Sequence, residues 1–330
     1  MLYTVSKQSN FQIRDLDYFK NTFDNRHVYL HKLLSMYDRD DIAFVECNSL
    51  LSDCLKYINE NKLTSKYKKV IVYMSELYWD TINKSSTINN LLDNNIFVIF
   101  NFFTKESPYN LKNKSYTSIG SFLDITEHYI KRYTFEKNQP KYNLISKFGR
   151  PNNERVTFYN ELKDYKTFVY SINNFDYNQN NIATKTFESE KNLSGDFKST
   201  VLPKEDFESI FSLDIETRLS QYEEAEHLVS CTEKTLKSFL FKRPTINVMQ
   251  KEAYEYFESF GFIFPNYFEL DHKTKHIDIC KKICELSLED CKTMALEYSY
   301  AYENNYKKVM DFIKHHKIKL DNIFYELYHK

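Results

Sequence analysis

Short runs of apolar, β-forming residues alternate with helical patterns in the first third of the chain. The runs are IAFVE at 42–46, KVIVYM at 69–74 and IFVIFNF at 96–102. After the first run, NSLLSDCLKYINEN repeats its apolar residues every three or four positions, which is typical of an amphipathic helix. Strands that alternate with helices favour a parallel sheet, so this part is predicted to be α/β and Rossmann-like.

The same order of elements returns in the second half. FSLDIE at 211–216 predicts a buried strand, and a polar turn and a helix opened by Thr232-Glu233-Lys234-Thr235 follow it. A second strand and a second helix then complete the stretch up to Phe262. After residue 265 the periodicity is helical throughout. The fold class predicted from the whole chain is therefore α/β, with two Rossmann-like domains and a C-terminal helical tail.

The domain boundaries follow from composition. TFEKNQPKYN at 134–143 combines charges with a proline that blocks helix continuation, and it is the predicted linker. We expect an N-terminal domain at 1–137, a second domain at 138–265 and a helical tail at 266–330 that packs on both domains. Residues 172–200 are polar and Asn-rich, which predicts a long loop.

Composition narrows the class of protein. The 330 residues are 42% hydrophobic and 28% charged with a net charge of -1, which favours a globular protein and gives no overall attraction to nucleic acid. The longest apolar run, 96–103, is too short to span a bilayer, and the N-terminus lacks a signal-peptide pattern, so we expect a cytoplasmic location. The abundance of Asn, Lys, Tyr, Phe and Ile points to an AT-rich, viral genome.

Several polar residues stand where α/β proteins bind anions. The helix that starts at Thr232 offers free N–H groups and the positive end of its dipole, which suits a diphosphate. Glu216 ends a buried strand, Ser171 ends the strand TFVYS, and Arg150 and Arg155 bracket a helix start. Each has a plain structural alternative: an N-cap for Thr232, a surface ion pair with Arg218 for Glu216, and surface solvation for the two arginines.

Two segments resemble the donor-binding domain of GT-B glycosyltransferases, particularly the viral and fucosyltransferase-like families. They are ISKFGRPNNERVTFYNELKDYKTFVYS at 145–171 and the T-E-K-T helix start that follows FSLDIE. The resemblance implies metal-independent transfer from a UDP- or GDP-linked sugar to a glycan or to hydroxymethylated DNA, with the first domain holding the acceptor and no further cofactor. It implies donor-nucleotide contacts from Arg150, Arg155, Ser171, Glu216, Thr232, Glu233, Lys234 and Thr235. Glu233 would bind the ribose, and Lys234 would face the phosphates.

The chain also departs from the family pattern. Met249-Gln250-Lys251 stand where a small residue often follows the second strand, which puts the sugar contacts in doubt. A catalytically inactive nucleotide- or partner-binding protein and a purely structural protein are the alternative functions.

Other candidate sites are weaker. Asp38-Arg39-Asp40 has the spacing of a GT-A metal motif but precedes a strand, and His27 and His31 lack further zinc ligands. Cys280, Cys284 and Cys291 fit an apolar helix face better than a metal site. The catalytic base of an inverting reaction is left open among Asp15, Asp17, His27 and Glu76.

Overall fold

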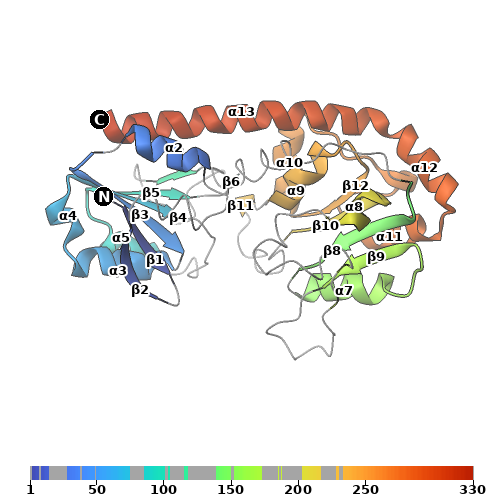
Figure 1. The fold of residues 1–330 in the computed structure, drawn as a ribbon, viewed down its shortest axis with the longest axis horizontal. Helices are drawn as coiled ribbons and strands as arrows, with labels where there is room; N and C mark the ends of the chain where they lie inside the picture. Colours follow the sequence, from blue (N-terminus) through green and yellow to red (C-terminus); the bar gives the residue numbers. More distant parts are fainter. Residues whose placement is uncertain are drawn as a thin grey trace. The chain divides into compact units, whose positions relative to one another are not determined.

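The chain folds into two compact units, each with its own sheet (Figure 1). Unit 1 comprises Met1–His128, His227–Ser230 and Ile313–Lys330, and unit 2 comprises Tyr129–Glu226 and Cys231–Phe312. The predicted α/β class is confirmed, whereas the predicted boundaries at 137 and 265 stay predictions. The computed structural model describes residues 2–6, 9–14, 28–37, 39–48, 50–74, 85–100, 103–104, 115–117, 139–149, 152–172, 185, 187, 203–216, 228–229 and 233–329.

The sheet of unit 1 has the strand order β2-β1-β3-β4-β5-β7. Its strands β3 (Ile42–Asn48), β4 (Lys69–Met74) and β5 (Ile96–Phe100) match the three predicted runs, and they pair in parallel. The sheet also contains β1 (Leu2–Ser6), β7 (Ser115–Thr117) and β2 (Ser9–Arg14), of which β2 alone pairs antiparallel, with β1. A short antiparallel pair, β6 (Phe103–Thr104) with β11 (Leu228–Val229), lies apart from this sheet.

Helices cover the sheet of unit 1. They are α2 (Val28–Met36), α3 (Leu51–Glu60), α4 (Leu63–Lys66) and α5 (Ser85–Leu91). One core cluster combines Leu33 and Leu34 of α2 with Phe44, Ile71 and other sheet residues. The end of the last helix of the chain, α13 (Ser299–His329), joins this cluster through Leu320, Ile323, Phe324, Leu327 and Tyr328. The C-terminal residues are therefore part of the core of unit 1.

The sheet of unit 2 is fully parallel, in the order β12-β10-β8-β9. Its strands are β8 (Tyr142–Lys147), β9 (Phe168–Ser171), β10 (Ser209–Ile215) and β12 (Thr245–Val248). Helix α7 (Asn153–Leu162) follows β8, α8 (Lys204–Phe207) precedes β10, α9 (Glu233–Leu240) follows β10, and α10 (Lys251–Ser259) follows β12. This alternation of strand and helix is the predicted one.

The predicted helical tail is present as α11 (His276–Glu285), α12 (Leu288–Glu297) and α13, after a short 3-10 turn at Tyr267–Glu269. Cys280, Cys284 and Cys291 are buried in the apolar core of unit 2, as predicted. Burial raises the pKa of Cys284 and of Cys291 to about 12, so both thiols stay protonated at neutral pH. No described helix has the length and apolar character needed to cross a membrane.

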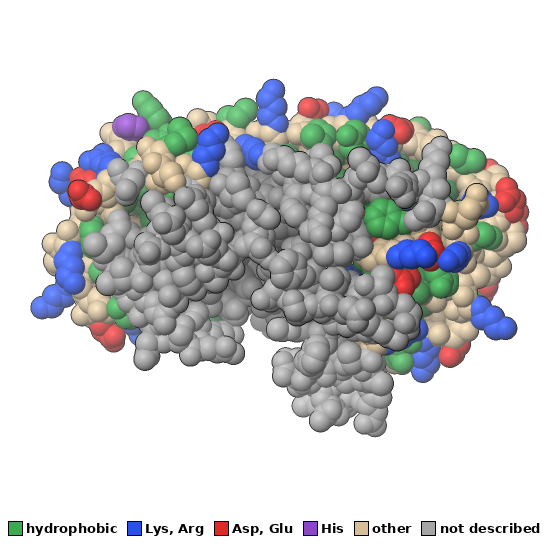
Figure 2. Space-filling view, in the orientation of Figure 1, with side chains coloured by type: hydrophobic (Ala, Val, Ile, Leu, Met, Phe, Trp, Pro, Cys, Tyr) green, Lys and Arg blue, Asp and Glu red, His purple; other side chains and the backbone are tan. Residues whose placement is uncertain are grey.

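The surface mixes charges of both signs. On the face shown in Figure 2, Lys and Arg side chains alternate with Asp and Glu over the described part of the chain. This distribution agrees with the net charge of -1. It shows no single-sign stripe among the described residues of that face.

Candidate functional site

The two faces of strand β10 differ in chemistry. Phe211, Leu213 and Ile215 point into the apolar core shared with α7, α11 and α12. The alternate residues Ser212, Asp214 and Glu216 are polar, yet they are only 3%, 5% and 1% exposed. Because successive side chains of a strand point to opposite faces, these three polar residues share the second face of the sheet. Carboxylates this deeply buried need partners.

Strand register extends this polarity across the sheet. Asp214 pairs with Asn247 of β12, and Lys147 of β8 pairs with Ser171 of β9. Leu213 pairs with Ser146, so Lys147 is the next residue in register beside Asp214. Ser171, Lys147, Asp214 and Asn247 thus form one row on the second face, which we call the polar row. It crosses all four strands near their carboxyl ends, the usual ligand position in open α/β sheets.

Helix α9 covers the second face at β10 and β12. The hydroxyl of its buried Thr235 donates a hydrogen bond to Oε1 of Glu216. One turn further, the Ser238 hydroxyl lies 3.3 Å from Oδ1 of Asn247 and 2.7 Å from the carbonyl oxygen of Thr235. Glu216 therefore holds the first turn of α9 against the carboxyl end of β10, while Asn247 holds its middle.

Buried charges accompany these hydrogen bonds. Asp206 accepts from the Arg243 guanidinium through both its carboxylate and its carbonyl oxygen. Burial favours the protonated form of Asp206, but the charges of Arg243, Lys237 and Lys147 outweigh it and lower its pKa. Burial raises the pKa of Asp214, against the opposing charges of Lys237 and Arg243. Asp206, Asp214, Glu216, Lys147, Lys237 and Arg243 together form what we call the charged layer.

Arg155 connects the β8–α7 turn to β10. Its guanidinium Nη2 donates to the carbonyl oxygen of Ile215 over 3.0 Å, and the side chain is only 2% exposed. Asn152 caps α7 by accepting from the Arg155 N–H at 2.8 Å. Gly149 adopts φ +59° in this turn, a conformation that favours glycine, and the place of a missing Cβ lies 3.5 Å from Arg155 Nη1. Arg155 is thus a buried structural donor beside the site, whereas surface solvation was the plain alternative.

The structure brings several predicted residues together. Arg155, Ser171, Glu216 and Thr235 all lie at or next to the carboxyl edge of the unit 2 sheet, three of them at 6% exposure or less and Thr235 fully buried. Helix α9 begins at Glu233, so Glu233 and Lys234 occupy its first turn. The side chains of those two residues, and all of Arg150 and Thr232, lie outside the described residues.

The weaker candidates remain untested. Outside the described residues lie Asp38, the side chain of His31, and the candidate bases Asp15, Asp17, His27 and Glu76. Arg39 of the Asp-Arg-Asp motif binds Asp41 in a bidentate pair, with Nε–Oδ1 at 2.9 Å and Nη2–Oδ2 at 2.7 Å. The described residues contain no group of three His, Cys, Asp or Glu side chains that could hold a metal ion.

Sequence reasoning missed Lys147, Lys237, Asp214 and Asn247. The signal for Asp214 was present, because S-x-D-x-E places a polar residue at every second position of an otherwise apolar strand. Lys237 and Asn247 carried no comparable signal, since one polar residue in a helix or an edge strand normally faces water.

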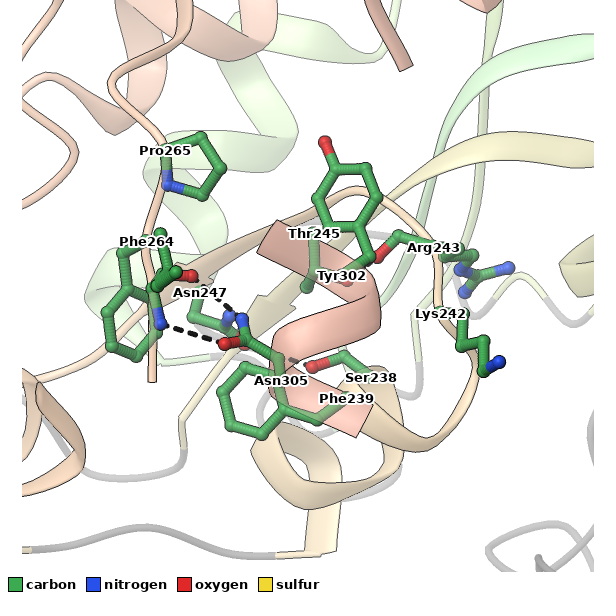
Figure 3. A pocket seen from close by; sticks show the side chains of 11 residues that line it. Ser238, Phe239, Lys242, Arg243, Thr245, Asn247, Phe264, Pro265, Tyr302 and Asn305 are labelled. Carbon is green, nitrogen blue, oxygen red and sulfur yellow. Dashed lines mark hydrogen bonds between the residues drawn. The ribbon is translucent and has the colours of Figure 1, made fainter. Parts of the chain in front are cut away.

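A small pocket lies at the opposite end of α9 (Figure 3). It is lined by residues of α9, the turn after it, β12, the 263–265 segment and α13. Asn305 of α13 accepts from the Ile263 N–H at 2.8 Å and donates to the Ile263 carbonyl oxygen at 2.7 Å. These paired bonds fasten the 263–265 segment, which indicates a structural role for this wall of the pocket.

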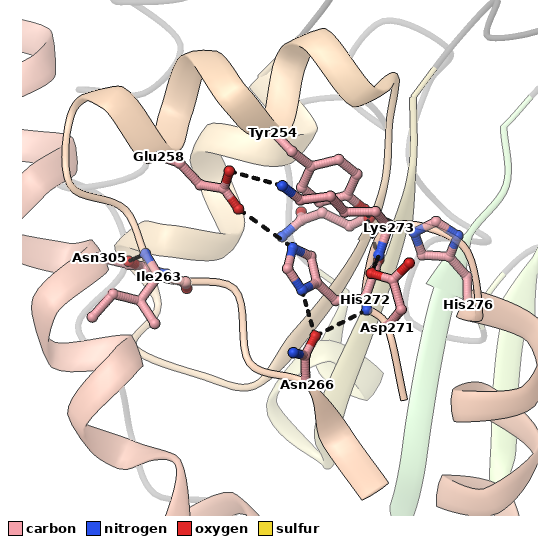
Figure 4. A network of polar contacts seen from close by, with 10 residues as sticks. Tyr254, Glu258, Ile263, Asn266, Asp271, His272, Lys273, His276 and Asn305 are labelled. Carbon is pink, nitrogen blue, oxygen red and sulfur yellow. Dashed lines mark hydrogen bonds and ion pairs between the residues drawn. The ribbon is translucent and has the colours of Figure 1, made fainter. Parts of the chain in front are cut away.

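A histidine cluster braces the other side of β12 (Figure 4). Tyr254 hydroxyl contacts the Asn247 carbonyl oxygen and lies 2.8 Å from His276 Nε2. His272 Nδ1 lies 2.7 Å from Asn266 Oδ1, and Glu258 pairs with Lys273 at 2.8 Å. Burial lowers the pKa of His276 to about 4, so its ring is neutral at pH 7. The cluster ties α10 and α11 to the edge strand and is structural.

The two α/β units, each built mainly of parallel strands, and the C-terminal helix agree with the GT-B fold, and a comparison with solved structures supports it. The crystal structure of the DNA modifying enzyme beta-glucosyltransferase, studied with and without the substrate uridine diphosphoglucose, matches with a TM-score of 0.50. The match covers 99% of this chain and 99% of that one at 12% sequence identity, which shows the fold alone. No protein-family model and no curated protein matches the sequence.

Proposed function

We propose that the protein is a glycosyltransferase that takes its sugar from a UDP- or GDP-linked donor. The main supporting observation is the hydrogen bond from Thr235 to Glu216, which fixes the first turn of α9 at the carboxyl edge of the unit 2 sheet. Free N–H groups at a helix start suit a diphosphate, and this edge is the usual nucleotide position in α/β sheets. The fold neighbour, whose substrate is uridine diphosphoglucose, supports the choice of donor.

The donor contacts come from the first turn of α9 and its surroundings. Glu233 would accept hydrogen bonds from the ribose hydroxyls, and Lys234 and the N–H groups at the helix start would face the phosphates. Arg150 and Thr232, which lie outside the described residues, would complete the set of contacts. Ser171 and Glu216 lie at the sheet edge, and Thr235 and Arg155 fix the backbone around them. The reaction would then depend on stabilising the negative charge that develops on the departing nucleotide, without a bound metal.

For the acceptor we infer a hydroxymethylated base in DNA. The fold neighbour is described as a DNA modifying enzyme and matches over 99% of this chain. A base inside a duplex must leave the stack to be reached, and phosphate contacts would hold the strand. The net charge of -1 means that such contacts must come from local Lys and Arg groups.

The first experiment is a thermal-shift panel of UDP, GDP, ADP, CMP and their sugar conjugates. A ligand at 100 times its dissociation constant adds about 2.7 kcal/mol of stability. We expect a selective shift that Glu233→Gln and Lys234→Met abolish. Lys242→Met is the matched control, because Lys242 lies just beyond the other end of α9 and pairs with Glu303 at 3.0 Å.

A transfer assay then tests the acceptor. The selected donor, with a labelled sugar, is offered hydroxymethylated duplex DNA, unmodified DNA and a glycan mixture. Label on hydroxymethylated DNA alone supports the proposal. Label on the glycans instead would mean that the acceptor is a glycan and not DNA. Nucleotide binding without transfer to any acceptor would favour the inactive binding protein, and the absence of any thermal shift would refute the donor site.

A further inference from the structure

We propose that Gln250 binds a hydroxyl group of the donor's sugar and thereby helps to select the sugar. The residue lies between strand β12 and helix α10, at the carboxyl edge of the unit 2 sheet. This inference rests on the proposed function, because it concerns the same donor site. The residues assigned to that site so far concern the nucleotide, so the sugar still lacks an assigned partner.

The amide group of Gln250 is placed in an unusual way. The residue as a whole is partly exposed, yet its Oε1 atom is buried and accepts no hydrogen bond. Buried polar atoms in folded proteins nearly always have a hydrogen-bond partner, and one without a partner lowers stability. Such an atom at the edge of a proposed ligand site indicates that its partner is a hydrogen-bond donor on the ligand.

Helix capping does not explain the glutamine. Gln250 is the N-cap of α10, and its backbone carbonyl oxygen accepts from the N–H groups of Ala253 and Tyr254 at 3.0 and 3.3 Å. Its side chain makes no cap hydrogen bond. Ser, Thr, Asp and Asn suit an N-cap better, because their short side chains reach the free N–H groups of the first turn. The backbone of Gln250 therefore serves the helix, whereas its amide turns toward a ligand without losing a hydrogen bond.

Strand pairing places Gln250 close to the proposed diphosphate position. The Glu216 N–H donates to the Val248 carbonyl oxygen at 3.0 Å. Gln250 follows Val248 by two residues, so their Cα atoms are at most about 7 Å apart. Glu216 also accepts from Thr235, which holds the first turn of α9 at the same edge. Gln250 is thus within reach of a donor whose diphosphate lies at that turn.

Strand order distinguishes the two ends of the donor. Ser171 ends β9, and Arg150 and Arg155 follow β8. In the order β12-β10-β8-β9 these three nucleotide candidates lie on one side of β10, and Gln250 lies on the other. A donor with its diphosphate at the start of α9 therefore directs its sugar toward β12. The chemistry agrees, because a hexose has several hydroxyl groups that can donate to an amide oxygen, whereas ionised phosphate oxygens only accept.

The test compares the affinities of UDP and UDP-glucose by calorimetry. UDP-glucose is the substrate of the fold neighbour, and the corresponding GDP pair is used if the thermal-shift panel selects GDP. Gln250→Met removes the amide at similar length. We expect unchanged affinity for UDP and about tenfold weaker affinity for UDP-glucose, the effect of one lost hydrogen bond. Gln250→Glu keeps an acceptor but adds a negative charge, so both affinities should fall by a similar factor. The control is Glu255→Gln on an exposed part of α10, which should change neither affinity.

Thermal unfolding separates sugar binding from a structural role. Because an amide oxygen without a partner lowers stability, Gln250→Met should unfold at the same temperature as the original protein or at a higher one. A lower Tm, or a failure to fold, would show a structural role and overturn the inference. Equal losses of UDP and UDP-glucose affinity in Gln250→Met would place the contact on the nucleotide and also overturn it.

Two outcomes distinguish this inference from the proposed function. If the original protein binds UDP or GDP, but Gln250→Met binds the sugar conjugate equally well, the inference is wrong and the proposed function stands. If the original protein binds no nucleotide at all, the proposed function fails and this inference fails with it.

Discussion

Replacing Arg243 with methionine should destabilise unit 2 by about 3 kcal/mol. The side chains of Arg243 and Asp206 are 14% and 6% exposed, and two hydrogen bonds join them. Methionine keeps most of the apolar stem but leaves the Asp206 carboxylate buried without its direct partner. Breaking a buried ion pair in this way costs ~3–5 kcal/mol, and the charges of Lys237 and Lys147 near Asp206 favour the lower end.

Thermal unfolding followed by circular dichroism measures the effect. In a unit of this size a loss of 1 kcal/mol lowers the Tm by roughly 2–4 °C, so we expect a decrease of roughly 6–12 °C. Hydrogen exchange of the peptides that contain β8 and β10 assigns the loss to unit 2. The double variant Asp206→Asn with Arg243→Met removes both charges of this ion pair, so no carboxylate is left without its direct partner, and it should regain about 2 kcal/mol of the loss.

The effect of pH provides a second check. Asp206 has a lowered pKa in the folded protein, so its contribution to stability is present above the unfolded pKa of about 3.9 and is lost as the pH falls through the folded value. The difference in stability between the original protein and Arg243→Met should therefore shrink below about pH 4. A Tm decrease no larger than that of Lys242→Met, whose exposed ion pair with Glu303 contributes little, would refute the reasoning.

Two further predictions concern the scaffold. His276, with a pKa lowered to about 4 by burial, must gain a proton on unfolding below its unfolded pKa of about 6.5, so stability is present above that value and falls on acidification. From pH 8 to pH 5, urea unfolding should show a loss of stability about 2 kcal/mol larger in the original protein than in His276→Gln, and equal losses in both proteins would contradict the assignment. Asn152→Ala removes the N-cap of α7 and should lower stability by about 1 kcal/mol, whereas Asn152→Asp should retain most of it.

The sequence predicted the elements of unit 2 well because its strands are short apolar runs bounded by turns. FSLDIE became β10, and the T-E-K-T stretch became the start of α9. In unit 1, β3, β4 and β5 were predicted for the same reason. Strands β1 and β2 were not predicted, because LYTVS and SNFQIR contain too few apolar residues to stand out from a loop.

The partners of the site residues could not be predicted. Glu216 was expected to pair with Arg218, which lies outside the described residues, or to face a ligand. The structure joins it to Thr235, 19 residues away, a partner that the sequence did not predict. Arg155 was expected to meet either water or phosphate, and it donates to a carbonyl oxygen 60 residues away. Such contacts depend on how α7 and α9 pack on the sheet, and local periodicity does not contain that information.

The two faces of the unit 2 sheet have different roles: one face packs in the apolar core, and the other carries the candidate site. Phe211, Leu213 and Ile215 face a continuous apolar core, and burial of that core stabilises the packing of the sheet against α7, α11 and α12. The opposite face carries buried charges, which stabilise a fold less than well-packed apolar residues of the same volume would. The pattern S-x-D-x-E places a buried polar residue at every second position, where an apolar residue would be more stable. Such a pattern indicates a face selected for a property other than stability. That pattern therefore points to the site more specifically than the T-E-K-T helix start, which an ordinary N-cap would explain equally well.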